Sequence, residues 1–190
     1  PTPISKQTGR GMRNALDLLG PEEAAIYRRG TGILMYVAPD RFDLQYACKV
    51  LAQDMSAPRV ISMARLRRVS RYCAGFPDVG TWFPYQAEPT GVTVWVDGDW
   101  SGDAVTCKST SAGSVQHGGH TLETWSVTQQ AISLSSGESE FYALGSGCAR
   151  GLTIKHVLQE VIDAQSSSTI VDMNINTDSD AAGGMLHRQG

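Results

Sequence analysis

The 190-residue sequence lacks a long hydrophobic run and lacks any closely spaced pair of cysteines. No stretch approaches the roughly 18 apolar residues of a membrane span, and no charged and then apolar signal segment stands at the amino terminus. The four cysteines are 25 to 41 positions apart, which indicates reduced thiols rather than a zinc motif or a disulfide framework. These absences predict an intracellular protein that is neither secreted nor embedded in a membrane.

Positive charge is scarce in the second half of the sequence. Residues 91–190 contain 4 Lys or Arg against 11 Asp or Glu, whereas residues 1–90 contain 12 against 8. A basic first half suits a polyanionic partner, and an acid-rich second half suits metal cations or simple solubility.

The chain divides by composition into three parts. Residues 1–20 are rich in proline and glycine and predict a linker or extended arm. Residues 21–88 carry helical periodicity and predict a small, mostly helical segment. Residues 89–190 alternate strand-like and helix-like stretches, which predicts an α/β domain.

The helical segment should contain three helices. Pro21 opens the first with acids in its first turn, and Asp40 or Asp43 can cap a second that runs to about Met55. Pro58 starts the third, and a short strand is expected at residues 81–83.

The third predicted helix carries five arginines within thirteen residues and no acid. They are Arg59, Arg65, Arg67, Arg68 and Arg71. They can form the solvated outer face of an amphipathic helix, or they can contact the phosphates of a nucleic acid. The sequence leaves both interpretations open.

Three acids stand at element ends in the α/β domain. A strand at 92–97 ends in Asp97, a helix from about residue 136 to 164 carries Glu140 near its start, and a strand at 170–177 precedes Asp178. Strands near 112–116 and 121–127, joined by a turn at 117–120, and a helix at 181–186 complete the order. The two histidines of that turn have no third ligand nearby, so they do not indicate a metal site.

A helix that connects two strands of one sheet normally makes a right-handed parallel crossover. The strands before Asp97 and Asp178 should therefore be parallel and deliver both acids to one sheet edge. Glu140 shares a helix face with small residues that allow close packing on the sheet, Ala143, Gly147 and Gly151. The core stripe expected on this helix is Phe141, Leu144, Cys148, Leu152, Val157, Leu158 and Val161.

Three converging carboxylates repel one another unless a cation lies among them. Hard oxygen ligands favour Mg²⁺ or Mn²⁺, and two such ions about 4 Å apart can support in-line cleavage of a phosphodiester. Taken singly, each acid could instead be a solvated strand end or a helix-dipole partner.

The motifs around these acids resemble the ribonuclease H-like domain of copia-type retrotransposon Pol polyproteins. They are VDGDWSGD at 96–103, KSTS at 108–111, LSSGESEFYAL at 134–144 and TDSD at 177–180. Stretches at 27–36, 41–56 and 69–72 resemble the tail that joins reverse transcriptase to that domain.

The resemblance implies an α/β, ribonuclease H-like mixed sheet of three antiparallel strands, a crossover helix and a parallel strand. It implies that Asp97 rather than Asp99, Glu140 rather than Glu138, and Asp178 are the catalytic metal ligands. Asp97 is favoured because it should end its strand. A fourth acid and a last strand of the family would lie past residue 190, so we expect a fragment of a longer chain.

The implied activity is Mg²⁺-dependent or Mn²⁺-dependent hydrolysis of the RNA strand of an RNA–DNA hybrid. Implied partners are the hybrid and the reverse-transcriptase portion of the same polyprotein. The candidate residues for contact with the hybrid are the five arginines and Lys108. The expected location is the cytoplasm or a retroelement particle. Two alternatives stay open: an inactive nucleic-acid-binding module, and a degraded retroelement fragment.

Overall fold

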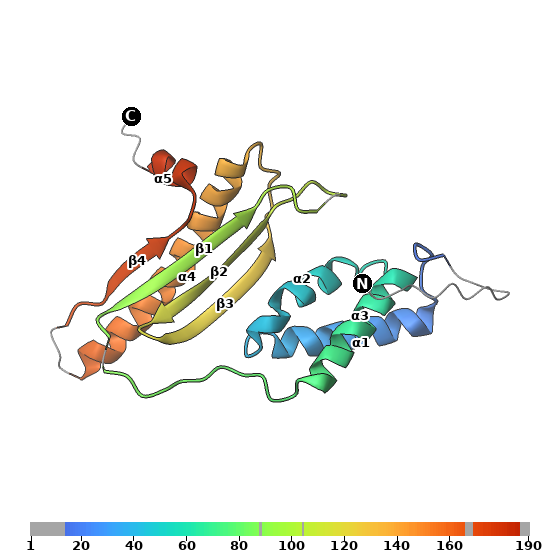
Figure 1. Cartoon of the computed structure of the whole chain (residues 1–190), viewed down its shortest axis with the longest axis horizontal. Coiled ribbons are helices and arrows are strands. Elements are labelled where there is room, and N and C mark those ends of the chain that lie inside the picture. Colours follow the sequence, from blue (N-terminus) through green and yellow to red (C-terminus); the bar gives the residue numbers. More distant parts are fainter. Residues whose placement is uncertain (1–13, 88, 104, 166–168, 187–190) are drawn as a thin grey trace.

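The computed structural model describes residues 14–87, 89–103, 105–165 and 169–186. A mixed sheet is covered on one face by a long helix, and three further helices form a separate group beside it (Figure 1). The elements in chain order are α1 (Pro21–Val37), the 3-10 helix η1 (Phe42–Leu44), α2 (Gln45–Gln53), α3 (Val60–Gly75), β1 (Gly91–Asp99), β2 (Thr110–His117), β3 (His120–Thr128), α4 (Ser136–Ala164), β4 (Asp172–Asn176) and α5 (Asp180–Leu186). Among the described residues, no helix combines the length and the apolar character that a membrane span needs.

The sheet has the strand order β3-β2-β1-β4, so β1 lies in its interior. β2 pairs antiparallel with both β1 and β3, whereas β4 is parallel to β1. Gly118, in the turn between β2 and β3, has a φ of 59°, a left-handed conformation that glycine adopts at little cost. The predicted fold class, a ribonuclease H-like mixed sheet with a crossover helix, is confirmed.

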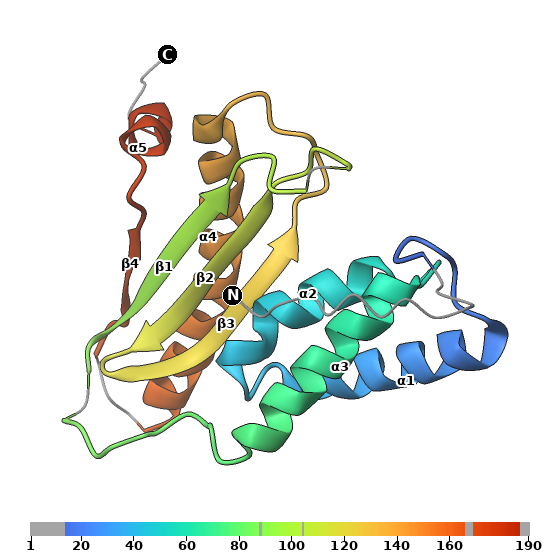
Figure 2. The ribbon, with the colours of Figure 1, turned by 45° about the vertical axis from the view of Figure 1, so that its right-hand side comes forward.

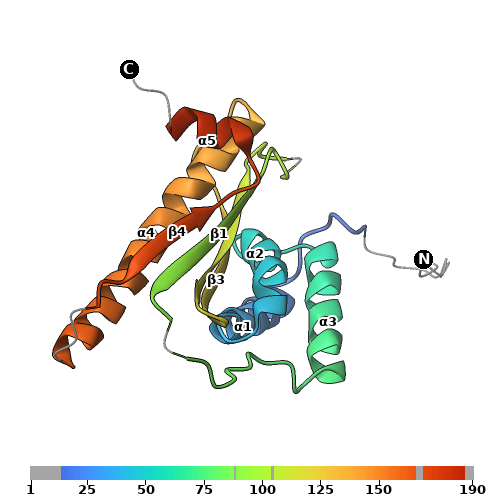
Figure 3. The ribbon, with the colours of Figure 1, turned by 60° about the vertical axis from the view of Figure 1, so that its left-hand side comes forward.

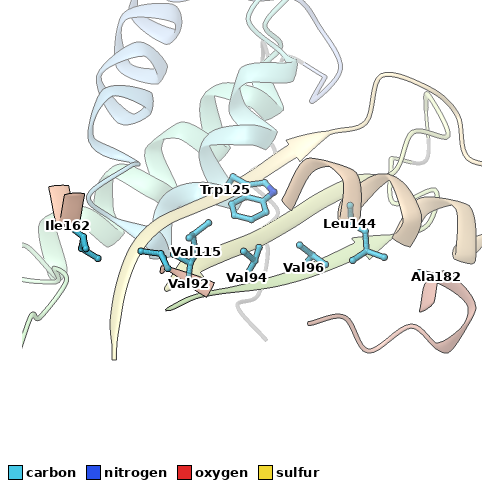
Figure 4. Close-up of a cluster of buried hydrophobic side chains, with 10 residues drawn as sticks. Val92, Val94, Val96, Val115, Trp125, Leu144, Ile162 and Ala182 are labelled. Carbon is cyan, nitrogen blue, oxygen red and sulfur yellow. The ribbon is translucent and has the colours of Figure 1, made fainter. Parts of the chain in front are cut away.

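The main core lies between β1 and α4. Alternate residues of β1 (Val92, Val94 and Val96) are buried and point towards the helix, as a period of two requires (Figure 4). On the helix, a side chain at Gly147 or Gly151 would collide with Val96 or Val94. The small residues therefore let the backbone of α4 approach the sheet closely.

The predicted core stripe of α4 is only partly right. Leu144 is buried and Leu158 packs against the core, but other members are 41 to 53% exposed. The exposed members are Phe141, Leu152, Val157 and Val161. The helix turns its small residues to the sheet, and this rotation carries the larger apolar side chains away from it.

The helical segment has its own core of Tyr27, Leu51, Met63 and Leu66. The Tyr27 hydroxyl donates to the carbonyl of Leu51 at 2.6 Å, which ties α1 to α2. Figure 2 shows α1 and α3 packed together, and in Figure 3 α2 stands between the sheet and α3.

Three polar residues of α2, spaced by four, hydrogen bond to the sheet. Gln45 donates to the carbonyl of Thr124 at 3.3 Å. Lys49 donates to the hydroxyl of Thr110 at 2.7 Å, and Gln53 to the hydroxyl of Thr128 at 3.3 Å. Because positions four apart share one helix face, a single face of α2 meets the edge of the sheet.

The segments around the helices differ from expectation in two places. Asp43 does not cap α2, because its carboxylate pairs with the Arg41 guanidinium at 2.8 Å, and η1 precedes the helix instead. The strand predicted at 81–83 is absent, and Trp82 there is 82% exposed. An apolar stretch with no neighbouring strand to accept its hydrogen bonds stays irregular.

The predicted arm at 1–20 lies partly outside the described residues. Its described end begins with a turn, in which Asp17 donates its backbone N–H to the carbonyl of Asn14 at 3.0 Å. It then runs beside the segment before α3, where Leu19 donates its backbone N–H to the carbonyl of Pro58 at 2.9 Å. The division near residue 88 stays a prediction, and residue 88 itself lies outside the described residues.

Candidate metal centre

β1 carries the first acid of the site. Asp97 pairs with Ala112 of β2 and is exposed. The strand continues past it to Asp99, so the expectation that Asp97 ends the strand is wrong. Asp99 is engaged elsewhere, because its carboxylate accepts a hydrogen bond from the backbone N–H of Thr110.

The first turns of α4 carry the second acid. The Ser135 hydroxyl caps the helix by accepting from the N–H of Glu138 at 3.2 Å. The Glu138 carboxylate folds back to accept from the N–H of Leu134 at 2.7 Å. Glu138 therefore stabilises the start of the helix, whereas Glu140 faces the sheet edge.

A close approach of backbones brings Glu140 to Asp97. A β-carbon at Gly98 would lie 2.9 Å from the carbonyl oxygen of Ser139. Real β-carbons essentially never come that close, so this glycine is what allows β1 and the first turns of α4 to touch.

Asp178 joins from the connection between β4 and α5. The N–H of Ser179 donates to the hydroxyl of Thr177 at 3.2 Å, and the Ser179 hydroxyl accepts from the N–H of Ala182 at 3.2 Å. These bonds turn the chain sharply into α5 and leave Asp178 exposed. Because β4 is parallel to β1, the turn lies at the same sheet edge as Asp97.

The three acids form one cluster. One carboxylate oxygen from each of Asp97, Glu140 and Asp178 can be chosen so that all three lie within 4.8 Å of one another. Burial raises the pKa of the Glu140 carboxyl, the charges of Asp97 and Asp178 raise it further, and the backbone N–H of Gly98 acts in the opposite direction.

The cluster fits a hard divalent cation. The Oε2 atom of Glu140 is buried, and no described residue supplies it with a hydrogen-bond partner. A buried carboxylate oxygen in that position costs free energy unless a donor or a cation meets it. Three oxygen ligands at an open sheet edge are a donor set that suits Mg²⁺ or Mn²⁺.

The structure separates the five arginines, but not Lys108, from this cluster. The five arginines are exposed on α3 or just before it, across α2 from the sheet (Figure 3). Of these five, Arg65 pairs with Asp54 at 3.4 Å, and the others form no ion pair with any described residue. Lys108 precedes β2 and so lies at the sheet end that carries Asp97.

The two histidines of the hairpin turn contact Pro84, Gln86 and Gly91, at the start of β1 and just before it. The ring nitrogens of His120 lie 3.0 Å from the Gln86 amide nitrogen and 2.6 Å from the carbonyl of Pro84. His117 Nδ1 lies 3.0 Å from the carbonyl of Gly91. These contacts hold the segment before β1 against the hairpin.

Comparison with known proteins identifies the family. The chain is 34% identical over 140 residues to the retrovirus-related Pol polyprotein from transposon RE2 of Arabidopsis thaliana, a match that covers 74% of this chain and 9% of that protein. It is 29% identical over 160 residues to the polyprotein from transposon RE1 of the same plant, covering 84% of this chain and 11% of that protein. The chain belongs to the retrotransposon Pol polyprotein family.

The Pol family chain spans about a tenth of the length of these two curated relatives. It also matches an uncharacterized mitochondrial protein of Arabidopsis thaliana, 32% identical over 119 residues that cover 62% of this chain and 49% of that protein. No family model matches the chain. No solved structure gives a significant match.

We expect Glu140→Gln to stabilise the metal-free protein at neutral pH. A carboxyl whose pKa is raised by folding stabilises the fold when protonated, and this contribution is lost as pH rises through the raised value. The neutral amide should therefore raise Tm at about pH 7 by about 2–4 °C, which corresponds to about 1 kcal/mol for a chain of this size. Thermal unfolding in EDTA measures the shift, which should vanish near pH 4.

The control is Glu138→Gln in the same turn. It weakens the bond to Leu134 N–H and should give no gain. A Glu140→Gln variant that is less stable than the wild type at neutral pH in EDTA would contradict the repulsion among the three carboxylates.

Proposed function

We propose that this Pol family chain carries the metal centre of a ribonuclease H-type nuclease, which hydrolyses the RNA strand of RNA–DNA hybrids. The observation that carries the proposal is the cluster of Asp97, Glu140 and Asp178, in which Glu140 presents an unpartnered buried oxygen. The retrotransposon Pol context supports it, because a reverse-transcribing element produces such hybrids as intermediates.

In this proposal the three carboxylates hold Mg²⁺ or Mn²⁺. A divalent ion bound there would lower the pKa of a water molecule and stabilise the charge on the leaving oxygen of a phosphodiester. Asp97 and Asp178 are exposed, so a nucleic-acid backbone can reach their oxygens. Glu140 is half-buried and must lose its proton before it can act as a ligand, so activity should rise with pH as Glu140 ionises.

The test is a cleavage assay of the full chain on labelled duplexes. RNA–DNA hybrid, double-stranded RNA and double-stranded DNA of one sequence are incubated with Mg²⁺, with Mn²⁺ or with EDTA. Cleavage of the RNA strand of the hybrid alone, in either metal and not in EDTA, is expected, because recognition rests on 2′-hydroxyls and helix shape. Equal cleavage of all three duplexes, or none of the hybrid, would refute the proposal.

A second candidate is a module that grips the duplex without cleaving it. It is favoured by the five arginines on or just before α3, which are exposed and, except for Arg65, have no ion-pair partner among the described residues. α2 stands between this helix and the sheet that carries the acids (Figure 3). Basic side chains on an exposed helix bind phosphates irrespective of sequence. The match to the mitochondrial protein is consistent with the remaining alternative, a degraded retroelement fragment.

Both candidates share one prediction about α3. The double substitution Arg67→Ala/Arg71→Ala should weaken hybrid binding and lower the slope of log affinity against log salt by about 2, since two phosphate contacts are lost. Fluorescence anisotropy over a salt series measures the slope. Lys155→Ala on α4 removes a charge elsewhere and should leave the slope unchanged. An unaltered slope in the double variant would show that these arginines form a solvated helix face and do not contact phosphates.

A further inference from the structure

Gln129 is buried behind the acid cluster although it lies in a connecting loop. It is the first residue after β3, its side chain is 7% exposed, and its backbone N–H donates to the carbonyl of Ser109 at 2.8 Å. Polar side chains this deeply buried need hydrogen-bond partners, and its partners show what it holds together.

The amide nitrogen of Gln129 reaches two elements. It donates to the carbonyl of Ser139 on α4 at 2.9 Å and to the hydroxyl of Ser111 on β2 at 3.0 Å. These two bonds use both amide hydrogens, so the longer approach to the Ser139 hydroxyl at 3.3 Å is at most shared. The amide oxygen accepts from the hydroxyl of Ser133 at 2.8 Å, which fixes the orientation of the amide.

Ser139 extends the same network to β1. Its hydroxyl donates to the backbone carbonyl of Asp99 at 2.6 Å. Ser139 is fully buried and directly precedes Glu140. The residue next to a candidate metal ligand is therefore held from two sides, by β2 through Gln129 and by β1 through its own hydroxyl.

We propose that Gln129 is the positioning residue of the metal centre, which locks the first turns of α4 onto the sheet so that Glu140 stays beside Asp97. The expected effect on metal affinity rests on the proposed function. The positioning of α4 by Gln129 rests on the hydrogen bonds alone. Nothing in the sequence distinguishes Gln129 from its exposed neighbour Gln130, because only the fold turns one of them inward.

A purely structural role for the hydrogen bonds of Gln129 would have a different consequence. If Gln129 only stabilised the loop at 129–135, its loss would lower global stability without loosening α4 selectively. Substitution at a core position far from the acids provides the comparison. Val115 is fully buried on β2, pairs with Val94 and lies four residues along the strand from Ser111.

The experiment compares Gln129→Met with Val115→Ala in the full chain. Methionine keeps the length of the side chain and removes its hydrogen bonds. Hydrogen exchange of the amides from Ser139 to Tyr142 should accelerate at least about tenfold in Gln129→Met, while amides in the second half of α4 keep the wild-type rate. Mn²⁺ affinity should fall by about 10–100-fold, as for other residues that orient metal ligands. Val115→Ala should change neither quantity by more than about twofold while it remains folded.

Ser139→Ala is the second variant in case Gln129→Met does not fold. It removes the bond to Asp99 and should shift both readouts in the same direction by a smaller factor. The positioning role would be overturned if hydrogen exchange at residues 139–142 were unchanged in a folded Gln129→Met variant. If Gln129→Met does not fold, unchanged exchange in Ser139→Ala would overturn it. Failure of the wild-type chain to bind Mn²⁺ would refute the proposed function, and the exchange comparison would still decide the role of Gln129.

Discussion

Asp97→Asn is expected to lower cleavage of the RNA strand of a hybrid by at least about 10³-fold, or about 4 kcal/mol of transition-state stabilisation. Asp97 is the one acid of the cluster that lies within a paired strand of the sheet, so its position is the most firmly held. An asparagine keeps the shape but removes the charge and one oxygen ligand. Initial rates at saturating Mg²⁺ measure the loss, and a Tm in EDTA no lower than that of the wild type shows that the fold is intact.

Asp99→Asn is the matched control for that experiment. It makes the same chemical change two residues away, on the same strand, and the amide oxygen of the substituted side chain could still accept from the N–H of Thr110. The variant should retain activity within about tenfold, since Asp99 is outside the cluster. Equal losses in the two variants would show that general charge, and not a ligand at Asp97, supports cleavage.

Gly147→Ala should be destabilising although alanine is the better helix former. A β-carbon at this position would overlap the Val96 side chain, so the helix must move away from the sheet. Overpacking of this kind costs about 1–3 kcal/mol, so after the roughly 1 kcal/mol that alanine gains over glycine in a helix the net loss should be up to about 2 kcal/mol. Urea unfolding measures the free energy of unfolding directly.

Gly145→Ala makes the same change two residues earlier in α4. A β-carbon at Gly145 meets nothing within 4 Å, so this variant should be more stable than wild type by about 1 kcal/mol. The two substitutions should therefore change stability in opposite directions. A stabilising Gly147→Ala would contradict the close contact of α4 with β1.

The arrangement of the three acids follows from the sequence because it depends on topology. A strand ending near Asp97, a long helix and a second strand before Asp178 can form one parallel crossover, and α4 is the long helix that stands between those strands in the chain. Asp97 reaches the cluster although it lies inside β1 rather than at its end, and its role as a metal ligand stays a prediction. Glycines on α4 predicted which face of that helix meets the sheet.

Other features could not be predicted, because they depend on contacts between distant segments. The apolar residues Leu152 and Val157 fit a helical core stripe by spacing alone, but the glycine face competes for the sheet and determines the rotation of α4. The docking of α2 through Lys49 onto Thr110, and the burial of Gln129, join residues that no periodic pattern connects.

We propose that Asp97, Glu140 and Asp178 bind a divalent cation together. Titration of the full chain with Mn²⁺, followed by electron paramagnetic resonance of the free ion, tests it without requiring catalysis. The structure predicts saturable binding that each of Asp97→Asn, Glu140→Gln and Asp178→Asn weakens beyond the roughly 10–100-fold loss typical of outer-shell substitutions. Binding that survives all three single substitutions, or no binding by the wild-type chain, would contradict it.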